Sequence, residues 1–210
     1  GYGSMDDVDA DATVGASTEN IFIGKDCGGG TWATAVSNYN VSIGNLAMDA
    51  VMNGAQQNTG IGYNSLGELT LGDHNAAVGA SAGAAITKGQ YNVAFGKSSL
   101  SAETVGNDSV AVGHQALVSQ IAGSDNAVMA NVAVGKNSGY WNQTGANNTY
   151  IGYKAGFGVD GQSNSGNTAV GKDAMLAVTT GAGNVAVGAG ALDGTDDGAN
   201  NIAIGYGSLS

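Results

Sequence analysis

The chain repeats one short pattern, in which an Asn precedes three mostly apolar residues and a Gly follows them. The clearest copy is Asn184-Val185-Ala186-Val187-Gly188, and eleven copies run between residues 20 and 205. Side chains alternate between the two faces of an extended chain, and a short apolar run bounded by Asn and Gly is typical of a β-strand. The pattern therefore predicts eleven short strands.

The spacing of these copies indicates a solenoid. The interval between successive repeat Gly residues is 17 in six of ten cases, and only Ser109 departs from Asn in the first column. Each 17-residue unit, or rung, should contact only its neighbours, and stacked Asn amides should pair with corner backbone groups and with one another. The residues expected to form this structural ladder are Asn20, Asn40, Asn58, Asn75, Asn92, Asn131, Asn148, Asn167, Asn184 and Asn201, with Gly24, Gly44, Gly62, Gly79, Gly96, Gly113, Gly135, Gly152, Gly171, Gly188 and Gly205.

The second half of each unit is patterned as well. A small residue stands three positions after every repeat Gly. A second Gly stands ten positions after the repeat Gly in eight of ten complete units. The segment has no helical apolar stripe, so two short strands and two turns fit a rung, with a Gly at each turn. The sequence predicts an all-β fold, a parallel β-solenoid or β-roll with rungs of about 17 residues that rises about 4.8 Å per rung and roughly 50 Å in total.

The strand pattern also suggests which face is buried. The first and third apolar residues, such as Val41 and Ile43, are expected to form the intramolecular core, whereas the mostly Ala middle column faces another layer or subunit. Phe22 and Tyr150 interrupt that column and should mark places where the packing widens or where this face is not at an interface. Because the section is thin, we expect a parallel homotrimer closed by cyclic symmetry through the Ala face. The alternatives are a monomeric roll whose Ala column faces its own second strand, and an end-to-end filament.

Two regions are expected along the chain. Residues 1–19 form one or more irregular, acidic partial rungs, and residues 20–210 form one solenoid of about eleven rungs that is cut within a repeat at both ends. The expectation for the ends comes from the match between Gly1-Tyr2-Gly3-Ser4-Met5 and the segment at 205–209, which suggests an excerpt from a longer protein.

The charge of the chain makes some classes of binding partner unexpected. A net charge of -11 with only six Lys and Arg residues gives no basic stripe, so nucleic acid and anionic membranes are not expected partners. No apolar run is long enough for a transmembrane helix, so this segment should not insert into a membrane.

One acidic segment resembles a calcium-binding loop. Asp7, Asp9 and Asp11 alternate along the chain and Glu19 follows, which supplies oxygen ligands of the kind that Ca²⁺ prefers. The position where an EF-hand needs Gly holds Ala12, and Glu19 comes one residue late. A solvated acidic turn is the favoured interpretation, and Ca²⁺ is the only cofactor considered.

The remaining candidates favour structural roles. Cys27 stands in the small-residue column and is expected to fill space, and His74 and His114 occupy different columns, so they are expected to be turn residues and not ligands or bases. Trp32, Tyr39 and the pair Tyr140 and Trp141 could stack on carbohydrate, although packing against a neighbouring rung is favoured. Asn164, outside the Asn column, is expected to be exposed.

The segments NVAVGAGAL, NTAVGKDAM and NIAIGYGSL resemble the repeats of bacteriophage tail fibres and of the heads of trimeric autotransporter adhesins. The resemblance covers about residues 20–210. It implies left-handed parallel β-roll rungs, three chains side by side, and a role in surface attachment. The rungs are longer than is typical of adhesin heads, and their spelling is closer to that of tail fibres.

The sequence thus predicts a non-enzymatic shaft segment of a viral tail fibre, which spaces a receptor-binding tip for host attachment. The alternative is a segment of a bacterial surface adhesin or extracellular filament, and a minor alternative is a left-handed β-helix acyltransferase. The expected location is extracellular, on a virion or a bacterial cell surface. The expected partners are further copies of the chain, with a host receptor or glycan bound through regions outside this segment.

Overall fold

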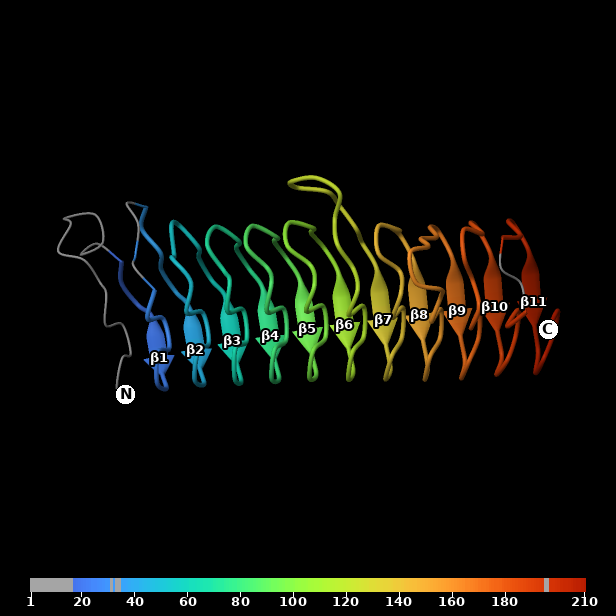
Figure 1. The fold of residues 1–210 in the computed structure, drawn as a ribbon, viewed down its shortest axis with the longest axis horizontal. Helices are drawn as coiled ribbons and strands as arrows, with labels where there is room; N and C mark the ends of the chain where they lie inside the picture. The colour runs from blue at the N-terminus through green and yellow to red at the C-terminus, as the bar shows by residue number, and fades with distance from the viewer. Residues whose placement is uncertain (1–16, 31, 33–34, 195–196) are drawn as a thin grey trace.

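The computed structural model describes residues 17–30, 32, 35–194 and 197–210, and these residues form a rod built from a single parallel sheet (Figure 1). The described residues contain eleven strands and no helix. The strands follow one another across the sheet in chain order, so each pairs only with the preceding and the following strand. They are β1 (Ile21–Ile23), β2 (Val41–Ile43), β3 (Thr59–Ile61), β4 (Ala76–Val78), β5 (Val93–Phe95), β6 (Val110–Val112), β7 (Val132–Val134), β8 (Thr149–Ile151), β9 (Thr168–Val170), β10 (Val185–Val187) and β11 (Ile202–Ile204).

The rungs stay in register even where the spacing changes. Ala111 of β6 pairs with Ala133 of β7 although 22 residues separate them, as directly as Ala186 pairs with Ala203 across the usual 17. The extra residues leave the stack as the loop that projects between β6 and β7 in Figure 1. The predicted parallel solenoid with a repeat of about 17 residues is therefore confirmed, and insertions are accommodated outside the sheet.

The expected assignment of the two strand faces is wrong. The middle residue is buried in every strand except β1, where Phe22 is half-buried, whereas the third residue is exposed in eight of the eleven strands. Val41 is half-buried and Ile43 is exposed. The Ala column lies inside the roll because the other side of the rung packs directly against it, and a thin section leaves room only for small side chains there.

In the described residues, the other side of each rung is not the second strand that we expected. Instead, left-handed backbone conformations recur two and four residues after each repeat Gly, as at Asn64 and Leu66, with φ of 52° and 51°. Such φ values are unfavourable for Leu, but the chain still bonds to its neighbours: Met48 N donates to Ser65 O and Leu66 N donates to Ala82 O, each at 3.1 Å. The hydrogen bonds between rungs therefore continue without a second sheet.

Large core residues on one side of the section face small residues on the other side. In most rungs an inward Ala meets a buried Leu or Met from the other side, as Ala111 and Leu117 do. Tyr150 is fully buried in the middle column, and a Cβ on Gly139 would lie 2.8 Å from its ring. A Cβ on Gly28 would similarly lie 2.7 Å from the Phe22 ring. Phe22 and Tyr150 are thus matched by Gly on the opposite side, and they do not mark an intermolecular face.

The repeat Gly is required for two reasons. Gly113 has a φ of 133°, which disfavours any residue with a side chain, and a Cβ there would lie 2.6 Å from the carbonyl oxygen of Gly135 in the next rung. Most of the second Gly column lacks positive φ, and four of its members, Gly72, Gly89, Gly145 and Gly181, have the same close approach: a Cβ on Gly89 would lie 2.5 Å from Gly106 O. Both turns therefore bring successive rungs too close for a side chain.

This architecture predicts that whole rungs can be removed. Deleting residues 172–188, which are 17 residues, joins Gly171 to Ala189 and places β11 next to β9 in the same register. We expect a cooperative thermal transition by circular dichroism and a scattering profile for a rod shortened by about 4.8 Å. Deleting only residues 172–180 shifts the columns out of register, and we expect it to unfold the C-terminal rungs. Equal stability of the two deletion variants would contradict the stacked-rung architecture.

Candidate functional site

The Asn column forms a continuous chain of buried hydrogen bonds through the rod. Asn58 Oδ1 accepts from the backbone N–H of Asn75 at 2.9 Å and from the Nδ2 of Asn75 at 3.1 Å. Asn75 Oδ1 in turn accepts both groups of Asn92, at 3.1 and 3.2 Å. All three side chains are at most 2% exposed. We call this column, from Asn20 to Asn201 with its substitutes described below, the asparagine ladder.

Each Asn amide of the ladder from Asn20 to Asn184 also bridges its rung to the opposite turn. Asn75 Nδ2 donates to Gly89 O at 2.8 Å, and Asn92 Nδ2 donates to Gly106 O at 2.8 Å. One side chain therefore satisfies a backbone donor at the strand start and a backbone acceptor across the section. Burying either backbone group without a partner would cost about 1 to 3 kcal/mol, so the ladder provides what water cannot supply inside the rod.

Gln120 repairs the ladder at Ser109, the one position where Asn is missing. Ser109 N still donates to Asn92 Oδ1 at 3.0 Å. Gln120 Nε2 donates to Ser109 Oγ at 3.0 Å, and Gln120 Oε1 accepts from Asn131 Nδ2 at 2.9 Å. The side chain of Gln120 thus occupies the place of the absent amide. Sequence reasoning missed this role, and its only signal was the coincidence of Ser109 with the longest interval between repeat Gly residues.

Glu103 is a second buried polar residue that sequence reasoning missed. Its Oε1 accepts from the backbone N–H groups of Thr104 at 2.8 Å and Gly106 at 2.7 Å, and its Oε2 accepts from Gln120 Nε2 at 2.9 Å. The side chain is fully buried. Because several N–H groups converge on one carboxylate, Glu103 holds the turn where the long insertion follows.

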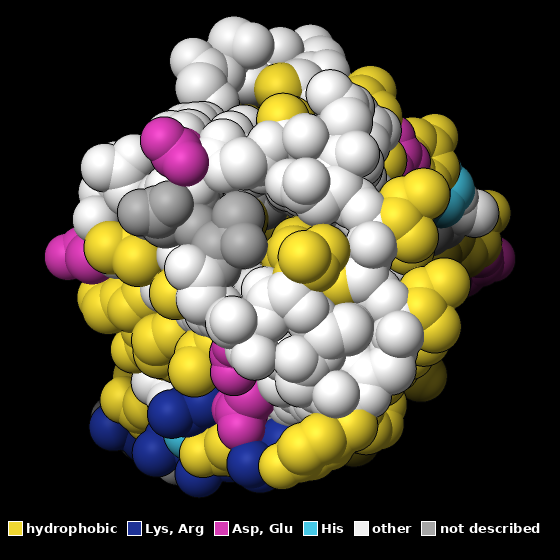
Figure 2. All heavy atoms as spheres, turned by 90° about the vertical axis from the view of Figure 1, so that its right-hand side faces the viewer, with side chains coloured by type: hydrophobic (Ala, Val, Ile, Leu, Met, Phe, Trp, Pro, Cys, Tyr) yellow, Lys and Arg dark blue, Asp and Glu magenta, His cyan; other side chains and the backbone are white. Residues whose placement is uncertain are grey.

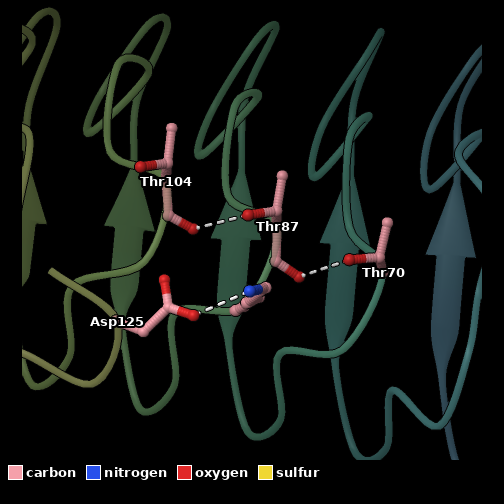
Figure 3. Close-up of polar contacts among 5 residues, drawn as sticks. Thr70, Thr87, Thr104 and Asp125 are labelled. Atoms are coloured by element: carbon pink, nitrogen blue, oxygen red, sulfur yellow. Dashed lines mark hydrogen bonds and ion pairs between the residues drawn. The ribbon is translucent and has the colours of Figure 1, made fainter.

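A row of Thr residues runs along the rod on the side where Glu103 lies (Figure 3). Thr70 Oγ1 donates to Thr87 O, and Thr87 Oγ1 donates to Thr104 O, each at 3.1 Å. Below them, Lys88 Nζ lies 2.7 Å from Asp125 Oδ2 and ties the projecting loop to an earlier rung. Both charged side chains are about half exposed, so this ion pair contributes at most about 1 kcal/mol.

Most of the candidate calcium site lies outside the described residues. Asp7, Asp9 and Asp11 belong to the undescribed segment, so the structure does not test their arrangement. Glu19 is described, and its carboxylate forms a hydrogen bond that raises the pKa of Tyr39. Within residues 17–30, 32, 35–194 and 197–210, no cluster of three His, Cys, Asp or Glu residues could hold a metal ion.

Cys27, His74 and His114 occupy three different positions in the repeat. Cys27 is fully buried, and its Sγ donates to Ser42 O and Oγ at 3.2 Å. His74 stacks on Tyr91 with ring centroids 4.9 Å apart, at the turn before the Asn column. His114 follows a repeat Gly at the opposite turn, and its Nδ1 is buried without a hydrogen-bond partner. Cys27 thus occupies the core, whereas the two His residues lie at opposite ends of their rungs.

Two of the candidate carbohydrate platforms differ in exposure. Trp32 is buried, packs edge-on against Phe22 at 5.6 Å, and donates from Nε1 to Gly28 O at 3.1 Å. Its expected alternative role in packing is therefore confirmed. By contrast, Tyr140 and Trp141 are half-buried and cluster with Phe157 on the surface.

Tyr39 is the third candidate platform, and it is exposed. Asn164, which was expected to be exposed, is only 3% exposed. Its Oδ1 accepts from the Tyr150 hydroxyl and from Asn167 Nδ2, the latter at 2.8 Å, and its carbonyl accepts from Asn148 Nδ2. The carbonyl of Asn164 therefore takes the place of the second Gly carbonyl in its rung. Tyr150 lies buried beside Asn164, and this burial raises the pKa of the Tyr150 hydroxyl.

Five of the six Lys residues fall on one edge of the rod, where the chain turns directly after the repeat Gly. We call the part of this edge on the rungs of β5 to β9, formed by Lys97, His114, Lys136, Lys154 and Lys172, the lysine edge. Figure 2 shows Lys side chains gathered at the lower left of the end-on view, beside hydrophobic side chains. The count of six Lys and Arg residues did not reveal this edge, because a count ignores the position of each residue in the repeat.

The last Lys of this edge has a carboxylate partner and borders a pocket. Lys172 Nζ lies 2.6 Å from Asp173 Oδ2, and this hydrogen bond raises the pKa of Lys172. A shallow pocket of about 310 Å³ lies beside the pair, lined also by Tyr206 and Ser210. The lysine edge is thus a continuous surface feature and not an enclosed site.

Comparisons with protein-family models, curated proteins and solved structures find no match to this chain. Within the part of the chain that the structure describes, no helix is long and apolar enough to cross a membrane.

The ladder geometry predicts the effect of removing one amide. Asn184 is 1% exposed, and its Oδ1 accepts from Asn201 N at 2.8 Å while its Nδ2 donates to Gly198 O at 2.7 Å. We expect Asn184→Ala to lower the free energy of unfolding by about 1 to 3 kcal/mol, because both backbone groups lose their partner. Denaturant titration measures this change.

The matched control is Gln162→Ala, which removes an amide from an exposed side chain. We expect it to change the free energy of unfolding by less than about 0.5 kcal/mol. Asn164 is unsuitable as a control because its side chain is buried and hydrogen-bonded. Equal losses in the two variants would show that the ladder has no special weight.

Proposed function

We propose that this chain is a rigid, non-enzymatic shaft segment of an extracellular attachment fibre, of the kind found in viral tail fibres, where it spaces a receptor-binding region from its support. The observation that carries the proposal is the single sheet of eleven rungs in unbroken register. Because every rung is fixed to the next by backbone bonds and by a buried amide, length is added without a hinge. A rod of this kind serves as a spacer.

The enzymatic alternative finds less support. A general base must reach its reacting group within hydrogen-bond distance, yet His74 and His114, the two residues that such a mechanism would use, are set at opposite turns. His74 is also stacked on Tyr91. We therefore assign the rod a structural role and no catalytic step.

The outward strand face supports assembly of several chains. The third strand residues, from Ile23 to Ile204, are all Val, Ile or Phe, and we call them the apolar ribbon. Phe95 is 54% exposed and Ile151 is 41% exposed. Parallel sheets are usually covered on both faces, and a continuous apolar patch of this length is typical of an interface. Here one face of the sheet covers the core and the other is left to be covered by another copy.

We propose a parallel homotrimer that is joined through the apolar ribbon. A closed cyclic assembly buries an identical face from each copy and leaves no open-ended adhesive surface. The number three follows from the resemblance to tail-fibre and adhesin repeats. The Ala column, which we expected to form this contact, is not available because it already lies in the core of each chain. The apolar ribbon takes that role instead.

Electron microscopy with an antibody raised against the 210-residue chain tests the proposed location. We expect gold label on fibres that project from virus particles in a preparation from the source organism. Label on the outer surface of bacterial cells would favour the adhesin alternative. Label confined to the cell interior would contradict an attachment fibre of either kind.

Two neighbouring residues separate folding from assembly. Ala186 is fully buried and Val187 is 38% exposed on the apolar ribbon. We expect Ala186→Glu to abolish the folded circular dichroism signal, because it places a charge in the thin core. We expect Val187→Glu to keep that signal and to reduce the mass in light scattering from three chains to one. A wild-type mass of 20.5 kDa would refute the trimer.

A further inference from the structure

We propose that the lysine edge binds an extended acidic polysaccharide that lies along the rod axis. The inference is independent of the proposed trimer and of the fibre role, because it depends only on the charge and geometry of one chain. The rod itself would then contribute to attachment, in addition to any receptor-binding region outside this segment.

Backbone hydrogen bonds hold the lysine edge in line. Gln115 N donates to Lys97 O at 3.0 Å, Asn137 N donates to His114 O at 2.9 Å, and Lys154 N donates to Lys136 O at 3.0 Å. Five successive rungs therefore present four Lys residues and one His along about 19 Å, given a spacing of about 4.8 Å per rung. Lys154 stands two residues after its repeat Gly, whereas the other four residues directly follow theirs. The resulting row along the rod axis matches an extended polymer better than it matches a compact ligand.

The central cations are available for a ligand. Lys97 and Lys136 are exposed, and neither has an ion-pair partner among the described residues. Lys154 Nζ lies 5.2 Å from the centre of the Phe157 ring, a contact that leaves its charge unneutralised. The first three residues after the repeat Gly contain no carboxylate in the rungs of β5 to β8. On this edge only Lys172, at one end, is paired with an acid.

The remaining charge of the molecule makes this edge unusual. The chain has a net charge of -11, yet its lysines are collected at one turn. At the opposite turn, Asp73 and Asp108 directly precede or lie close to the Asn column. A polyanion is thus attracted to a narrow line and repelled by the opposite turn. This arrangement favours a thin single chain over double-stranded nucleic acid, which is wider and whose binding sites carry many more cations.

Aromatic residues on the same edge favour sugars. Tyr153 occupies the position after the repeat Gly that Lys holds in neighbouring rungs, and it is 41% exposed. The half-buried cluster of Tyr140, Trp141 and Phe157 follows in the same rungs, with Lys154 against the Phe157 ring. Aromatic side chains that combine an apolar ring with a polar tip suit the mixed surface of a sugar ring, while the lysines suit its carboxylate or sulfate groups.

The test compares two double variants with the same change in charge. Lys97→Ala with Lys136→Ala removes the centre of the lysine edge, and Ala is the residue that other rungs place there at Ala80 and Ala189. The control is Lys25→Ala with Lys88→Ala. Lys25 lies on the same edge of the rod but in the rung of β1, outside the lysine edge, and both control lysines are paired with a carboxylate, Lys25 with Asp26 at 3.5 Å and Lys88 with Asp125 at 2.7 Å. Binding of heparin and of polygalacturonate to the full 210-residue chain is measured by calorimetry at several salt concentrations, with dextran as the neutral polymer.

We expect wild type and control to bind the acidic polysaccharides and not dextran. The edge variant should bind at least about tenfold more weakly. The slope of the logarithm of its binding constant against the logarithm of salt concentration should become shallower by roughly 0.7 for each lysine removed. An unchanged melting temperature shows that the edge variant is folded. Charge reversal in Lys136→Glu should weaken binding further than Lys136→Ala does.

Four outcomes would overturn the proposal. They are absence of wild-type binding to either acidic polysaccharide at low salt, equal weakening in the edge and control variants, tighter binding to single-stranded poly-dT than to the polysaccharides, and a changed mass of the edge variant in light scattering. The third outcome would favour nucleic acid. The fourth would show that this edge is a contact between copies of the chain.

Discussion

Backbone polar groups inside a very thin section must be satisfied without water, and the buried Asn amide does this in each rung. Its oxygen accepts from the next strand start and its nitrogen donates across to the opposite turn, as Asn92 does toward Ser109 N and Gly106 O. Ser and Thr donate and accept through a single oxygen, whereas Asn carries a carbonyl acceptor and an NH2 donor on separate atoms of a short side chain. Where Asn is absent, Gln120 reaches into the gap, so the interaction is kept although the residue changes.

This constraint determines the rest of the section. At both turns successive rungs lie so close that a Cβ on Gly113 or Gly89 would collide with the next rung. The sheet places small middle residues such as Ala111 against the large residues of the opposite side, and it holds a large one such as Tyr150 only where Gly139 faces it. The larger apolar residues are therefore forced outward. An exposed ribbon of Val and Ile follows from a thin core, and it makes assembly with other copies the natural completion of the fold.

Periodicity predicted the strands, the parallel stack and the Asn and Gly columns, because these depend on neighbours one rung apart. It failed where the answer depended on the width of the section. Val41 and Ile43 seemed the better core residues by size, but only the middle residue fits inside. The second strand is missing because φ is positive at every other residue after the repeat Gly, as at Asn64 and Leu66. A residue such as Leu does not signal this backbone in the sequence. The lysine edge was hidden because composition counts charges and ignores their register, and Asp7, Asp9 and Asp11 lie outside the described structure.

Side-chain amide exchange, measured by nuclear magnetic resonance, tests the ladder most directly. Asn126 and Asn147 are exposed and serve as references within the same molecule. The account predicts that the Nδ2 hydrogens of buried Asn75, Asn92 and their counterparts exchange orders of magnitude more slowly than those references, at rates close to those of the neighbouring strand amides. Exchange of the buried column as fast as that of Asn126 would contradict the central role of the ladder.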